Sequence, residues 1–112
     1  MKEVRWLGDS RSVAAFFPRG ARLKLGRELT RVQLGADPKH GKSLPQVGRG
    51  VQEIRISDNK ETFRVIYVAS IGVRIFVLHA FHKKSKQGIE TPKTELELAR
   101  RRYRMLVGEN HE

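Results

Sequence analysis

Residues 51–81 read VQEIRISDNKETFRVIYVASIGVRIFVLHAF, and this stretch contains three apolar runs separated by two short polar turns. The runs cover residues 51–56, 62–69 and 73–81. They are rich in β-branched and aromatic residues, which favour strands, and the turns carry Asp, Asn, Ser and Gly. Because the connections are short, the three strands are predicted to form an antiparallel meander. The third run is almost continuously apolar, so we expect it to be central and covered on both faces.

Helical patterns precede this strand region. Residues 2–7 are predicted to form a short strand, and a short helix capped by Asp9 or Ser10 is expected to end at Phe16. A second helix is predicted from Arg19 to Leu34, so that the two helices form an αα-hairpin. Its expected buried stripe consists of Leu25, Leu29 and Val32.

A C-terminal helix is predicted to follow the strands. Thr91 and Pro92 suit the cap and the first helical position, and the helix is expected to reach Val107 and to close at Gly108. Its apolar stripe consists of Leu96, Ala99, Tyr103 and Leu106. The predicted order is therefore β-α-α-β-β-β-α, an α+β fold with an antiparallel sheet in a single domain over residues 1–112.

The chain carries a large excess of positive charge. Lysine and arginine number 23 against 12 aspartates and glutamates, which gives a net charge of +11. A solvated surface is one interpretation, but charge well beyond the needs of solubility favours binding to a polyanion such as nucleic acid. Residues 36–50 are predicted to form a long loop, of a kind that is often functional. This loop and the linker after the third strand contain the residues that we assign to RNA binding, namely Lys42, Arg49, Lys84 and Lys86.

The composition also excludes several classes of site. The chain has no cysteine, which rules out disulfides, thiolate metal sites and thiol catalysis. His79 and His82 are three residues apart in a strand and therefore point to opposite faces, so we expect neither a metal nor a cofactor. No apolar segment is long enough to span a bilayer, and the first ten residues lack the apolar run of a signal peptide. We therefore expect a cytoplasmic protein with no membrane partner.

Two arginines, Arg55 and Arg64, interrupt the predicted strands. Each could be a surface residue or a partner of Glu53, because an unpaired arginine is costly to bury. The apolar residues that alternate with them are Ile54, Ile56, Phe63, Val65 and Tyr67. If these residues share one face of the sheet, Arg55 and Arg64 share the other, because pairing fixes the parity of side chains.

The same parity argument extends to His79. If Phe76 and Leu78 join the apolar face, His79 lies on the arginine face, whereas the opposite parity places Leu78 beside Arg64. Taken alone, His79 could be a hydrogen-bonded core histidine. The strand is followed by a cationic cluster, which could also be only a solvated loop: His82, Lys83, Lys84 and Lys86.

Such a group of side chains suits the cleavage of RNA without a metal. The attacking group would be the 2′-hydroxyl of the RNA itself, so DNA would be inert. Arginines make bidentate contacts with phosphate oxygens, lysines supply positive charge, and a histidine can carry protons near neutral pH.

The sequence resembles the phage-derived, HigB-like branch of the RelE/ParE toxin superfamily. The resemblance covers most of the chain, from Trp6 to about Tyr103. It rests on four segments: GVQEIR at 50–55, FRVIY at 63–67, VLHAFHKK at 77–84, and TPK at 91–93 leading into ELA at 97–99. The resemblance implies a RelE-like fold and the toxin of a type II toxin–antitoxin system. It further implies a ribosome-dependent mRNA endonuclease that inhibits translation.

By this resemblance, Arg64 would contact the scissile phosphate, and Lys83 would protonate the leaving group or hold phosphate. Arg55, His79 and Lys84 belong to the same pattern, and His82 beside the lysines is a further candidate proton carrier. The implied partners are mRNA on the ribosome and a helix-turn-helix, HigA-like antitoxin. The alternatives are a ParE-like toxin that acts on DNA gyrase without cleaving RNA, a passive RNA-binding module, and an inactive relative of the toxins.

Overall fold

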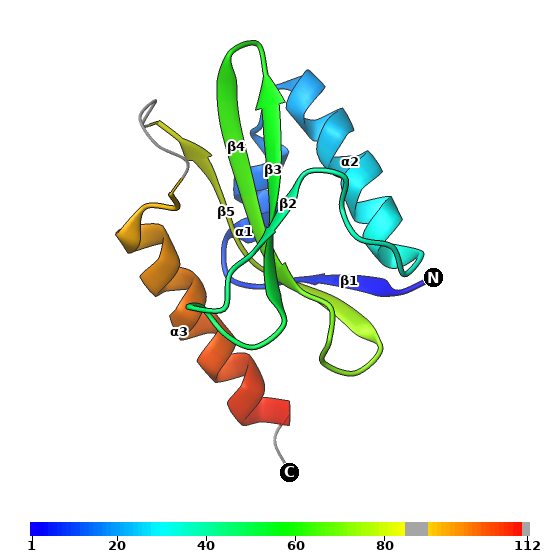
Figure 1. The fold of residues 1–112 in the computed structure, drawn as a ribbon, viewed down its shortest axis with the longest axis vertical. Coiled ribbons are helices and arrows are strands. Elements are labelled where there is room, and N and C mark those ends of the chain that lie inside the picture. The colour runs from blue at the N-terminus through cyan, green and yellow to red at the C-terminus, as the bar shows by residue number, and fades with distance from the viewer. Residues whose placement is uncertain (85–89, 111–112) are drawn as a thin grey trace.

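A five-stranded sheet forms the centre of the molecule, with its strands in the order β1-β5-β4-β3-β2 (Figure 1). The computed structural model describes residues 1–84 and 90–110. The strands are β1 (Glu3–Trp6), β2 (Gly41–Ser43), β3 (Val51–Asp58), β4 (Glu61–Val68) and β5 (Arg74–Lys83). The helices are α1 (Ser10–Ala15), α2 (Arg19–Gln33) and α3 (Lys93–Asn110). The α+β class and the β3-β4-β5 meander are confirmed.

The sheet differs from the prediction in two respects. It is mixed rather than antiparallel, because β1 lies parallel to β5, with Glu3 opposite Arg74 and Trp6 opposite Val77. In addition, the predicted loop over 36–50 contains β2, which pairs antiparallel with β3. A strand of three residues is too short to show an alternating pattern in the sequence.

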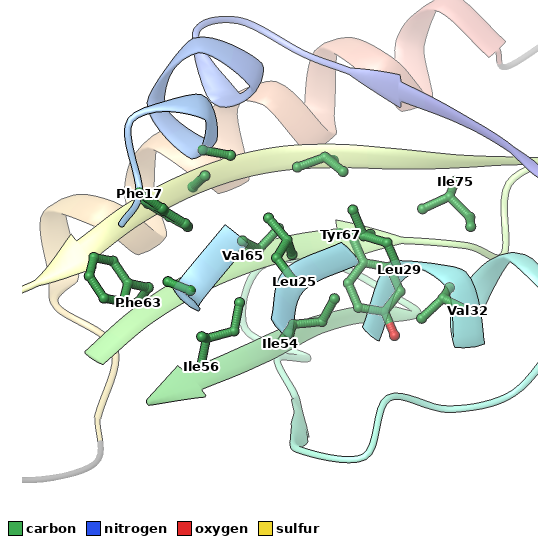
Figure 2. Packing of buried hydrophobic residues seen from close by; sticks show 14 residues of the cluster. Phe17, Leu25, Leu29, Val32, Ile54, Ile56, Phe63, Val65, Tyr67 and Ile75 are labelled. Atoms are coloured by element: carbon green, nitrogen blue, oxygen red, sulfur yellow. The ribbon is translucent and has the colours of Figure 1, made fainter. Parts of the chain in front are cut away.

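Helices α1 and α2 cover one face of the sheet. Leu25, Leu29 and Val32 of α2 are buried there, as predicted, and they pack against apolar side chains of β3 and β4 (Figure 2). Phe17, after α1, lies against Phe63 of β4 with 4.8 Å between ring centroids. Helix α2 ends at Gln33, close to the predicted boundary.

Helix α3 covers part of the opposite face, which we call the α3 face. The predicted stripe is confirmed, since Ala99 and Leu106 are buried and Leu96 and Tyr103 pack beside them. The helix begins at Lys93 and continues to Asn110, so the prediction that it closes at Gly108 is wrong. No helix within residues 1–84 and 90–110 is long and apolar enough to cross a membrane.

Candidate functional site

The register of β3 and β4 brings Arg55 and Arg64 together. Arg55 lies directly opposite Arg64, and the apolar pairs Ile54–Val65 and Ile56–Phe63 flank them on the other face. This confirms the parity predicted from the alternation of the two strands. Both arginines therefore project from the α3 face, beside Glu53 of β3, which lies on the same side.

Glu53 is completely buried and links these side chains. One carboxylate oxygen, Oε1, accepts hydrogen bonds from Arg55 Nε at 3.2 Å and from Arg64 Nη1 at 3.0 Å. The other oxygen, Oε2, accepts from the hydroxyl of Thr91 at 2.7 Å. A buried carboxylate is stable only when it is paired and hydrogen-bonded, and here both oxygens are engaged. We call Glu53, Arg55, Arg64 and Thr91 the Glu53 cluster.

Arg64 is almost fully enclosed, with 4% of its surface exposed. Burial is the main cause that lowers the pKa of its guanidinium, Arg55 lowers it further, and the Glu53 carboxylate acts in the opposite direction. A guanidinium remains protonated at neutral pH even after such a shift. Arg64 therefore presents a fixed positive charge that Glu53 holds in one orientation.

Lys83 lies at the end of β5 on the same face. Lys83 pairs in register with Thr62, and Phe81, two residues earlier in β5, pairs with Arg64. Lys83 and Arg64 are therefore diagonal neighbours across the two strands. Burial lowers the pKa of the Lys83 ammonium, and the charges of Arg64 and Arg55 lower it further. A lysine of this kind releases a proton more readily than an exposed one.

His79 also faces α3, but the structure places it between two partners. Its Nε2 lies 2.5 Å from Glu95 Oε1, and its Nδ1 lies 3.3 Å from Arg102 Nη1. Since a guanidinium can only donate, Nδ1 must accept and Nε2 must carry the hydrogen that is donated to Glu95. In this arrangement His79 links β5 to α3, with both ring nitrogens engaged.

A β-bulge explains why His79 lies on this face. His79 pairs with Ile66 and Val77 pairs with Tyr67, so Leu78 has no opposite residue in β4. Leu78 and His79 therefore both lie on the α3 side, where Leu78 is part of the apolar cluster under the helix. The expected position of His79 is confirmed, whereas the premise that Phe76 and Leu78 join the opposite face is wrong, because both pack in the cluster under α3.

His82 lies on the face covered by α1 and α2, away from the Glu53 cluster. It pairs with Phe63 in register and stacks on its ring, with 4.7 Å between centroids. Its Nε2 lies 2.9 Å from Glu61 Oε1. The structure therefore separates His82 from Arg64, and the prediction that His79 and His82 point to opposite faces is confirmed.

The remaining predicted residues lie around this site. Lys42 of β2 is half-buried and pairs in register with Glu53. Lys84 is exposed directly after β5, and Arg49 is exposed in the segment before β3, where its carbonyl accepts from Tyr103. Lys86 lies outside the described residues. No group of three or more potential metal ligands lies together in the part of the chain that the structure describes.

Two members of the Glu53 cluster were not predicted as site residues. The sequence indicates a helix cap at Thr91, and it indicates Glu53 only as a possible partner of Arg55 or Arg64. The signal in the sequence was the spacing of Glu53 and Arg55, which places an acid and a base on the same face of one strand. Thr91 is 38 residues from Glu53 in the chain, and its contribution depends on the packing of α3.

Comparison with known proteins identifies the family. A search of curated proteins found no match. The family described as Phage derived protein Gp49-like (DUF891) matches residues 14–104, which is well over half of the chain and includes the whole of the Glu53 cluster. The chain therefore belongs to the phage-derived Gp49-like family, a toxin-like family of the RelE and HigB type.

Proposed function

We propose that the protein is a HigB-like toxin of a type II toxin–antitoxin pair and that it cleaves mRNA on the ribosome. The observation that carries the proposal is the buried, preorganised pair of cations, Arg64 and Lys83, beside the Glu53 carboxylate. Preorganised donors that face the developing charge of a transition state are a major source of catalysis. Membership of a toxin-like family supports the same conclusion.

The proposed reaction is an in-line attack of the RNA 2′-hydroxyl oxygen on the adjacent phosphorus. A bond forms between the 2′-oxygen and phosphorus while the bond from phosphorus to the 5′-oxygen breaks, which leaves a 2′,3′-cyclic phosphate. Arg64 and Arg55 would stabilise charge on the non-bridging oxygens. Lys83 would donate its proton to the departing 5′-oxygen, and the 2′-hydroxyl proton would pass to water. A role for His79 in proton transfer requires that its bond to Glu95 opens when RNA binds.

The proposal is tested by primer-extension mapping of an mRNA in a translation reaction, with and without ribosomes. We expect cleavage by the wild-type protein only when ribosomes translate the message. Arg64→Ala should lower the cleavage rate roughly 100- to 1000-fold, because one such donor contributes about 3 kcal/mol to the transition state. Arg22→Ala, an exposed substitution of the same kind on α2, should leave the rate unchanged.

Arg64→Lys distinguishes a catalytic defect from loss of cleavage through unfolding. Lysine keeps the positive charge beside Glu53 but lacks the planar guanidinium. We expect this variant to melt near the wild-type temperature and to remain strongly impaired in cleavage. Intact mRNA together with poisoning of DNA gyrase would instead identify a ParE-like toxin. Ribosome or RNA binding without any cleavage would identify a passive binding module.

The toxin-like family also implies an antitoxin partner. We propose a helix-turn-helix, HigA-like antitoxin that covers the Glu53 cluster and the basic residues around it. Growth arrest on expression of the protein, relieved by co-expression of a neighbouring helix-turn-helix gene, would support this pairing. Growth arrest that persists despite the co-expressed protein would contradict it.

A further inference from the structure

An open groove of about 940 Å³ lies between α2 and the edge of β3. Its charged lining is almost entirely basic. The basic side chains are Lys24, Arg27, Arg31, Lys39, His40 and Arg55. Five of these six residues are exposed, and the sixth, Arg55, is half-buried.

The groove exists because β2 is short. Strand β2 pairs with β3 only as far as Ile54, and immediately beyond it the carbonyl of His40 accepts a hydrogen bond from the Arg55 amide at 2.8 Å. Past this point, the edge of β3 faces α2 across an open space. Three basic residues of α2, Lys24, Arg27 and Arg31, follow one another at spacings of three and four residues, so they form one row along the helix.

The acidic residue in the groove, Glu28, has a structural role. Its two carboxylate oxygens accept hydrogen bonds from the backbone amides of Lys39 and His40, at 3.0 Å and 2.9 Å. These bonds hold the segment before β2 against α2 and place its basic side chains opposite the row on the helix. The side chain of Glu28 is buried, so its carboxylate is withdrawn from the surface of the groove.

We propose that this groove binds the phosphodiester backbone of RNA. Among the described residues that line the groove, lysine and arginine outnumber carboxylates five to one, which suits a polyanion. Arg55 connects the groove to the Glu53 cluster, because it lines the groove and also donates to Glu53. The two sites meet at the edge of β3, where Arg55 belongs to both. This continuity favours RNA over an acidic protein segment, since one RNA strand that follows this edge would meet both the groove and the phosphate site. The inference rests on the proposed function for that neighbouring site.

The experiment measures binding without cleavage, using fluorescently labelled 2′-O-methyl RNA, which lacks the attacking hydroxyl. Fluorescence anisotropy compares oligonucleotides of about four and about twelve nucleotides, two lengths that fall within the known site sizes for single strands. The wild-type protein should bind the longer RNA more tightly. Arg27→Glu combined with Lys39→Glu should lower the affinity for the longer RNA at least about tenfold and the affinity for the shorter RNA less than about threefold. The dependence of affinity on salt should also become less steep, by about 0.7 for each phosphate contact that is lost.

The matched control is Arg11→Glu combined with Arg22→Glu, which makes the same change in charge at exposed positions outside the groove. An equal loss of affinity in this control would overturn the proposal, because total charge alone would then explain binding. Unchanged affinity of the Arg27 and Lys39 variant for the longer RNA would also overturn it.

Two further arms identify the source of the phosphates. Binding to ribosomes without mRNA tests ribosomal RNA as the ligand, whereas binding to the free oligonucleotide tests a single strand. Weaker binding by the Arg27 and Lys39 variant in either experiment supports the groove proposal. A variant that loses affinity only for a poly-glutamate peptide would show that an acidic protein segment is the ligand, which contradicts the proposal.

The outcome is separable from that of the proposed function. If the wild-type protein cleaves no mRNA but the length-dependent loss is observed, the nuclease proposal fails and the groove stands. If Arg64→Ala abolishes cleavage but the Arg27 and Lys39 variant binds every RNA normally, the groove proposal fails and the nuclease stands.

Discussion

Glu53 is the residue on which the arrangement of the cationic cluster depends. Arg55 and Arg64 occupy directly opposite positions in β3 and β4, where two like charges would repel each other. The buried carboxylate of Glu53 accepts from both and offsets that repulsion. The hydroxyl of Thr91 completes the hydrogen bonding of the carboxylate and connects it to the segment that leads into α3.

The substitution Glu53→Gln tests this role. Glutamine has nearly the same shape but removes the negative charge between the two arginines. We expect the free energy of unfolding to fall by about 3 kcal/mol, since removing one member of a buried ion pair typically costs this much. Urea denaturation measures the change. Glu97→Gln on the exposed side of α3 alters the net charge equally and should change stability by less than about 0.5 kcal/mol.

The buried ammonium of Lys83 predicts a pH dependence of stability. Its pKa is lowered from the ordinary 10.5, chiefly by burial and then by Arg64 and Arg55, so the unfolded chain binds more protons than the folded one between the lowered pKa and 10.5. Stability attributable to this residue therefore rises with pH through that window.

Lys83→Met removes the titrating group and keeps a long, flexible side chain. We expect this variant to be more stable than the wild type near pH 7 and the difference to shrink as the pH approaches 10.5. Urea denaturation at several pH values tests this expectation. A difference that stays constant with pH would show that Lys83 does not titrate differently on folding.

At the scale of the elements, Arg102 joins α3 to the rest of the molecule. Its guanidinium donates to the carbonyl of Leu78 at 2.9 Å and to Asp9 Oδ1 at 2.9 Å, and it lies 3.3 Å from His79 Nδ1. Leu78 is the additional residue of the β-bulge, so Arg102 supplies a donor where β4 has no residue opposite. One arginine thus connects α3, the bulge in β5 and the residue before α1.

Arg102→Met keeps most of the aliphatic stem and removes these bonds. We expect a loss of about 1–3 kcal/mol in stability, because a buried carbonyl is left without its donor. The pKa of Asp9, held below 3.8 chiefly by its hydrogen bond with Arg102, should rise toward that value, which NMR titration measures. Arg101→Met, at an exposed position of the same helix, should change neither quantity. An unchanged pKa of Asp9 in the Arg102 variant would contradict the assigned contact.

The elements that the sequence predicted well have strong local signals. The pairing of β3 with β4 follows from alternating apolar residues and a short turn, and α2 follows from its apolar stripe and from Gly35 at its end, with φ of 90°. Strand β2 and the bulge had no such signal. Three residues are too few to show a period, and Leu78 and His79 can share a face only because an additional residue is accommodated opposite β4.

At the scale of the whole molecule, the two layers of helices give the two faces of the sheet different roles. Helices α1 and α2 cover one face of the sheet, whereas α3 lies against the other face (Figure 1). The Glu53 cluster lies on the α3 face. The same edge of β3 that borders the cluster also borders the basic groove beside α2. The high net charge is therefore gathered, in part, into two adjoining sites that Arg55 connects.

The α+β class, the meander with its arginine pair, and the separation of His79 from His82 could all be predicted from the amino-acid sequence. These properties depend on residue periods of two and 3.6 and on short turns, which are local. The parallel placement of β1, the partners of His79, and the roles of Thr91 and Glu53 became clear only from the folded structure. Those depend on contacts between residues distant in the chain, such as Glu53 with Thr91, whose geometry is fixed when the helices pack onto the sheet.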